Sequence, residues 1–132
     1  MRVEVGAVAE THGRVVATLI TAVGTVGATW APSSRPPVEG EELHVELDLD
    51  LVLDPATNTH RAAAGQPALV DHGDHVIIEA TIEGIDDDGV AHLRLAPDGL
   101  VMVQTTGGVS VGDAVRIVAP AGALRATPFS GP

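Results

Sequence analysis

The sequence predicts an all-β fold, a small antiparallel β-barrel formed by a single domain. Apolar and polar residues alternate with period two in most of the apolar segments, which is typical of strands with one buried face. Clusters of glycine, proline and aspartate separate these segments, as turns do between strands. At 132 residues the chain has room for one hydrophobic core, so residues 1–132 are expected to form one domain.

The N-terminal part contains three predicted strands, which precede a proline-rich loop. Strands are expected at residues 3–9, 15–21 and 23–30, with a turn at His12 and Gly13. Residues 31–40 contain three prolines, which cannot donate to a ladder, and are therefore predicted to be a loop.

The clearest alternation lies in residues 44–53. One face carries apolar side chains: Val45, Leu47, Leu49, Leu51 and Leu53. The opposite face carries polar side chains: His44, Glu46, Asp48 and Asp50. We therefore expect a half-buried strand with an acidic outer face.

The stretch 54–73 is predicted to be a long loop with a helical turn near residues 59–64, and a loop of this length is usually functional or disordered. Strands are expected again at 76–83, after the acidic turn at 86–89, at 100–104 and at 113–118, arranged as a meander. Residues 13–47 and 89–117 share an outline of two strands, a glycine followed by an acid, and a further strand. This outline indicates a faint internal repeat.

Residues 73–120 carry a long strand into an acidic turn, a hairpin, and the step Val111, Gly112, Asp113 before a closing strand. This stretch resembles small Greek-key barrels of the oligonucleotide/oligosaccharide-binding (OB) type, and also the accessory barrels of some transporter ATPases. The resemblance implies an OB-like barrel with the N-terminal strands as additions. Nucleic-acid-binding members imply stacking aromatics and a basic groove, which the stretch lacks. Oxyanion binding would imply cationic or hydroxyl-rich loops, for which the stretch offers Thr105, Thr106 and Ser110.

The charge and composition exclude several classes of function. Eighteen acids and seven arginines give a net charge of −11, which opposes direct binding to nucleic acid. The absence of cysteine removes disulfides and thiol chemistry. The uncharged run 15–31 follows an acidic segment and contains four threonines, so we interpret it as strand rather than signal peptide or membrane span. A cytoplasmic location is the expectation.

The acids are concentrated in two segments without arginine. Fourteen of the eighteen lie within residues 39–54 and 71–88. If the two strands in these segments are neighbours, their outer faces combine into one anionic surface that can attract a basic protein partner. The residues predicted to contact that partner are Glu46, Asp48, Asp50, Glu79 and Glu83.

A second constellation, at residues 71–75, offers metal-ligand chemistry. His72 and His75 lie three residues apart beside Asp71 and Asp74, a set of ligand types that suits zinc. The acidic turn 86–89 lacks the alternating acids of a calcium loop, and no catalytic motif occurs. No cofactor is expected, and the chemistry favours a protein that is not an enzyme.

Three hypotheses of function follow. The first is a non-enzymatic binding module that contacts a protein partner through the anionic face. The second is a protein that binds a small molecule or divalent metal near His72 and His75. The third is a self-associating structural subunit, a homo-oligomer, because Leu100, Met102, Ile77 and Val90 fall on a nominally outer face.

Overall fold

The computed structural model describes residues 1–63 and 65–129. These residues form eleven strands and no helix, which confirms the all-β fold class and the small barrel. Within the same residues there is no helix of the length and hydropathy that a membrane span requires.

The first four strands form a Greek key. They are β1 (Arg2–Thr11), β2 (Arg14–Thr21), β3 (Gly24–Trp30) and β4 (Glu42–Leu53). Consecutive hairpins join the first three, and β4 returns after the loop 31–40 to pair with β1. The spatial order is therefore β4-β1-β2-β3, which defines the motif. The loop is where the prolines predict it.

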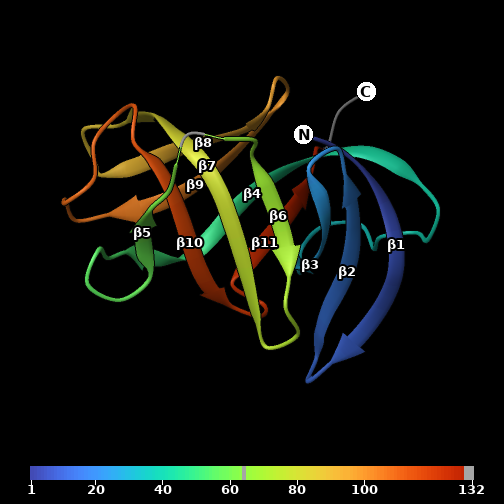
Figure 1. The fold of residues 1–132 in the computed structure, drawn as a ribbon. Coiled ribbons are helices and arrows are strands. Elements are labelled where there is room, and N and C mark those ends of the chain that lie inside the picture. Colours follow the sequence, from blue (N-terminus) through green and yellow to red (C-terminus); the bar gives the residue numbers. More distant parts are fainter. Residues whose placement is uncertain (64, 130–132) are drawn as a thin grey trace.

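The last strand of the chain closes this first half into a barrel. Strand β11 (Leu124–Pro128) lies between β3 and β4, parallel to β3 and antiparallel to β4. The ring β1-β2-β3-β11-β4 is thus complete (Figure 1). At the seam between β1 and β4 the Met1 amino group donates to the Val45 carbonyl (2.8 Å).

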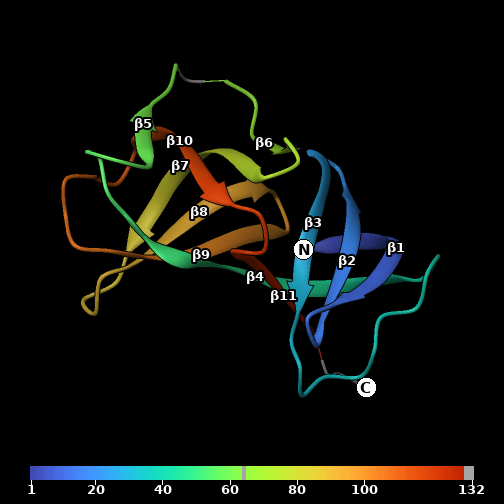
Figure 2. The same cartoon turned by 90° about the horizontal axis from the view of Figure 1, so that it is seen from below.

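A second Greek key is formed by the stretch that resembles OB-type barrels. Its strands are β7 (His75–Ile85), β8 (Val90–Ala96), β9 (Gly99–Thr105) and β10 (Ala114–Pro120). The order β10-β7-β8-β9 corrects the predicted meander, because β10 pairs with β7 rather than β9. The free edge of β9 pairs in parallel with β4. The closed ring therefore lies in the first half, and Figure 2 shows the second half beside it, with β4 and β11 between them.

The two halves repeat the same hydrogen bonds at the start of their fourth strand. The Gly40 amide donates to the Val5 carbonyl (2.8 Å), and the Val5 amide donates to the Glu41 carbonyl (2.9 Å). In the second half Gly112, Ile82 and Asp113 make the same two bonds, at 2.8 and 2.9 Å. Both glycines have positive φ, 89° and 94°, which favours glycine. The faint repeat in the sequence is therefore a structural repeat.

The stretch 54–73, predicted to be a loop with a helical turn, contains two short strands instead. They are β5 (Thr59–Arg61) and β6 (Ala68–Asp71). The prediction of a helical turn is wrong because β5 directs its backbone hydrogen bonds to the edge of β10. Strand β6 pairs with β7, and its Leu69 amide donates to the Val23 carbonyl, just before β3 (3.0 Å). It thereby joins the second half to the first.

One cluster of buried side chains runs through both halves, mainly valine, leucine, isoleucine and alanine. Alternation on β4 holds from Val45 to Leu53, with Leu53 buried and Val52 exposed. Leu51 is half-buried, beside a register shift between Leu49 and Val52. On β7, Ile77 is buried although the alternation predicts an outer position. Local alternation therefore fails where a strand is covered on both faces.

Candidate functional site

The five carboxylates predicted to form one anionic face lie in two separate places. Glu46, Asp48 and Asp50 are on β4, whereas Glu79 and Glu83 are on β7. Strands β9 and β8 separate β4 from β7 in the sheet. The condition for a combined surface, that the two acidic strands are neighbours, is therefore not met.

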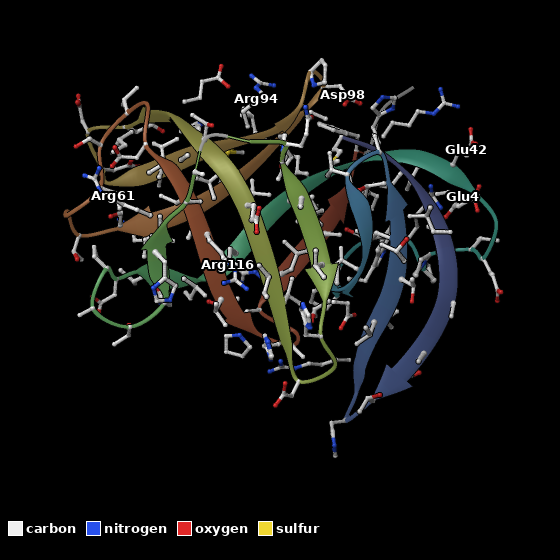
Figure 3. The ribbon with its side chains drawn as sticks, viewed as in Figure 1. Glu4, Glu42, Arg61, Arg94, Asp98 and Arg116 are labelled. Atoms are coloured by element: carbon white, nitrogen blue, oxygen red, sulfur yellow. The ribbon has the colours of Figure 1, made fainter. Side chains whose placement is uncertain are left out.

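The two carboxylates on β7 both form ion pairs. Arg94 contacts Glu83 through two nitrogens (2.5 and 3.0 Å), and its hydrogen bonds lower the pKa of the Glu83 carboxyl. Arg116 lies directly opposite Glu79 on β10, with 3.8 Å between Nε and Oε1. Figure 3 shows both arginines over the second half of the molecule. Much of the negative charge on β7 is thus compensated locally.

Of the three predicted carboxylates on β4, one is compensated by an arginine. The Arg125 Nε donates to Asp48 Oδ1 (2.6 Å), which raises the pKa of Arg125, and Asp50 adds to this effect through its charge. Asp48 and Arg125 are cross-strand partners on β4 and β11. Glu46 lies opposite Thr127, and among the described residues neither Glu46 nor Asp50 forms an ion pair. Uncompensated charge remains at these two positions.

Clefts border all three of the predicted contact carboxylates on β4. A cleft of about 340 Å³ over β4 and β9 is lined by Asp48, Asp50, Met102 and Arg125, among others. A second cleft of about 260 Å³ is lined by Glu46, Met102, Leu100 and others. Met102 belongs to both, so the two clefts flank it on the outer surface of the sheet. We call the pair of clefts the β4 groove.

A further cavity of about 340 Å³ lies at the end of the barrel, and we call it the mouth pocket. Three connections surround it: the β1–β2 turn, the loop 31–40 and the β10–β11 turn. Its charged lining residues are Arg14, Arg125 and Asp50. The mouth pocket and the β4 groove share Arg125 and Asp50, so they are adjacent.

The two predicted metal ligands come together without a third. The rings of His72 and His75 stack with centroids 5.3 Å apart, and His75 Nδ1 lies 2.6 Å from Asp74 Oδ1. That contact lowers the pKa of the Asp74 carboxyl. Within residues 1–63 and 65–129 no three histidines or carboxylates are placed to hold one ion, whereas protein zinc sites use at least three such ligands.

Sequence reasoning missed the residues of the mouth pocket apart from Asp50. Trp30 is the single tryptophan of the chain and directly precedes the proline-rich loop, a juxtaposition that could have drawn attention to this end of the barrel. Arg14 and Arg125 lie far apart in the sequence, and nothing local relates them. The nominally outer apolar face is expected to be covered, and within the chain Ile77 is buried whereas Leu100, Met102 and Val90 are half-buried.

Comparison of the chain with family models, curated proteins and solved structures finds no match.

Proposed function

We propose that the protein is a non-enzymatic binding module that contacts a basic segment of a protein partner through the β4 groove. The observation that carries the proposal is that the groove is bordered by the two β4 carboxylates without ion pairs, Glu46 and Asp50. Compared with the face predicted from the sequence, the surface is reduced to β4, with Glu79 and Glu83 outside it.

The chemistry of the groove suits a segment that carries positive charge and an apolar side chain. Glu46 and Asp50 are exposed carboxylates on either side of half-buried Met102. Lysine or arginine side chains of a partner would pair with the carboxylates, and an apolar side chain would cover Met102 and Leu100. The net charge of −11 increases the rate of encounter with such a segment.

A defined basic peptide tests this proposal. Binding of fluorescently labelled hexalysine is measured by anisotropy at several salt concentrations, for the wild type and for the variant E46Q/D50N. We expect the variant to weaken binding by roughly three- to tenfold at low salt, the size of one or two screened charge contacts. The difference should shrink as salt rises.

The matched control is E4Q/E10Q, which removes the same number of exposed negative charges from β1. It should change the peptide affinity by less than about twofold, because neither carboxylate lines the β4 groove. Equal losses in both double variants would show that the peptide responds to net charge alone, and the proposal would then be wrong.

A further inference from the structure

The mouth pocket has the size of a small-molecule site. Its volume of about 340 Å³ falls within the range of roughly 300–1,000 Å³ that is usual for such sites, and the mouths of β-barrels are among their common locations. Trp30, Pro32 and Pro36 provide apolar lining, and the hydroxyls of Thr29 and Ser34 belong to it as well. The pocket therefore combines an apolar wall with a few polar groups.

Hydrogen bonds hold the walls of the pocket in place. The Trp30 indole, which is 3 % exposed, donates its Nε1 hydrogen to the Arg35 carbonyl of the loop (2.8 Å). Arg35 is itself held by Glu41 (3.0 and 3.1 Å). On the other side Thr29 Oγ1 donates to the Gly122 carbonyl (2.9 Å). A ligand would not have to order these walls, which lowers the cost of binding.

The charge of the pocket differs from that of its surroundings. Two arginines, Arg14 and Arg125, line it together with one carboxylate, Asp50. The neighbouring cleft over β4 and β9 has more negative than positive lining residues, namely Asp48 and Asp50 with Arg125. Arg14 is exposed, and in the described part of the chain it forms no ion pair. In a chain with a net charge of −11, a free guanidinium at a pocket is available to an anion.

The second half of the molecule shows that the fold does not require this lining. The pairings of β2 with β3 and of β8 with β9 match for the five pairs from Val16 and Val90 onward, before a register shift after Arg94. In this alignment Thr29 corresponds to Gln104 and Trp30 to Thr105. The parallel pairings place Arg125 opposite Thr29 and Val52 opposite Gln104, so Arg125 corresponds to Val52.

Arg14 has no counterpart on a strand of the second half, because Arg14 pairs with Thr11 whereas β8 begins only at Val90, the counterpart of Val16. The second half thus has threonine and valine where the first has tryptophan and Arg125. The parallel strand pairing at these two positions forms with either set. The cationic and aromatic lining is therefore a property of the pocket rather than a requirement of the Greek key.

From these observations we infer that the mouth pocket binds a small organic molecule in which a carboxylate is attached to an apolar group. The guanidinium of Arg14 receives the carboxylate, since planar guanidinium and carboxylate groups form paired hydrogen bonds. Arg125 is already held by Asp48 and lines the pocket beside it. The apolar group packs against Trp30, Pro32 and Pro36. A single negative charge fits best, because a doubly charged phosphate would also face Asp50.

A matched pair of probes tests the inference. Cyclohexylacetate and cyclohexylacetamide have nearly the same shape, and the carboxylate is confined to the first. Because the chain contains one tryptophan and no tyrosine, its fluorescence reports Trp30 directly. At constant ionic strength we expect a saturable change of emission with cyclohexylacetate and a Kd for the amide at least about tenfold higher, as for the loss of a charged hydrogen-bonded contact.

Two arginine variants identify the anchor. R14Q should raise the Kd for cyclohexylacetate by about tenfold or more, whereas R61Q should leave it unchanged. Arg61 is a suitable control because it is exposed, forms no ion pair among the described residues and lies on β5, far from β1–β3 (Figure 3). Melting curves confirm that both variants fold.

Three results would overturn the inference: no saturable change with cyclohexylacetate, equal affinity for the amide, or equal binding by R14Q and R61Q. None of these results bears on the β4 groove, which is tested by the hexalysine peptide.

Discussion

The first half of the molecule (β1–β4) and the second half (β7–β10) have the same strand topology, but only the first half closes into a barrel. Both are Greek keys in which the first and fourth strands pair, and both have a strand running parallel to the third. In the first half, β11 continues from that position to pair with β4, and the ring closes. In the second half the far edge of β10 receives the three residues of β5, and the sheet stays open.

The barrel of the first half is therefore closed by a strand that follows the second half in the chain. Strand β11 follows β10 in the chain but belongs to the barrel of the first half. In the same way β4, which belongs to the barrel of the first half, pairs with β9 of the second half. Because each half uses a strand that continues from the other, we expect the two halves to unfold together.

A charge in the shared strand should have the largest effect. Leu49 is 4 % exposed on β4, so L49D buries an unpaired carboxylate at the crossing of both halves. We expect a loss of more than about 4 kcal/mol in the free energy of unfolding, or no folding at all. Denaturant titrations of the wild type should give the same midpoint by two probes. These are Trp30 fluorescence, which reports unfolding of the first half, and far-UV circular dichroism, which reports all strands.

The control for this prediction is V52D on the same strand. Val52 is 44 % exposed, and its substitution should change stability by less than about 0.5 kcal/mol. Equal tolerance of both substitutions would mean that the register of β4 is not as described. Separate midpoints for the two probes in the wild type would show that the halves are independent.

The repeated glycines should respond alike in the two halves. Gly40 and Gly112 have φ of 89° and 94°, and a Cβ at either position would meet no atom within 4 Å. G40A and G112A should therefore each cost about 1–2 kcal/mol through backbone strain alone. Thermal melts should give similar losses for the two variants.

G84A provides the reference for these two substitutions. Gly84 is not among the residues with positive φ, and its Cβ position is also open. This variant should be neutral or up to about 1 kcal/mol more stable. A large loss at one of Gly40 and Gly112 without the other would contradict the equivalence of the two turns.

The ion pair of Glu83 with Arg94 should give the smallest effect and should be confined to acid pH. The first half has no equivalent ion pair among the described residues, because the counterpart of Arg94 there is Ile20. The pKa of the Glu83 carboxyl is lowered by Arg94, so its contribution to stability is complete above the unfolded pKa of about 4.3 and is lost as pH falls through the folded value.

Melting temperatures of the wild type, E83Q, R94Q and the double variant, measured between neutral pH and about pH 3, form a double-mutant cycle. A small favourable coupling should be present at neutral pH and should vanish in acid. A coupling that is independent of pH would rule out the carboxylate as its source.

Much of the second half could be predicted from the sequence, because its turns are encoded locally. The acidic turn at 86–89 and the turn at 97–99 lie where aspartate and glycine predict them. The glycine and acid before each fourth strand also gave a trace of the repeat. The candidate sites were less accessible to sequence reasoning. Glu46, Asp48 and Asp50 were found through the alternation on β4. Arg125, in contrast, joins Arg14 and Trp30 of the β2–β3 hairpin only through the long-range pairing of β11 with β3.

Local sequence patterns were enough to predict the all-β class, the strand β4 with its acidic outer side, the proline-rich loop and most of the hairpins. Period-two alternation and turn residues act within a few positions of the chain. Which strands become neighbours depends instead on the tertiary fold. It paired β10 with β7, inserted β11 between β3 and β4, and placed arginines opposite Glu79 and Asp48. Backbone hydrogen bonds between strands do not depend on the identity of the side chains. The pairing of strands that are distant in the sequence is therefore determined by how the two halves bury their common core.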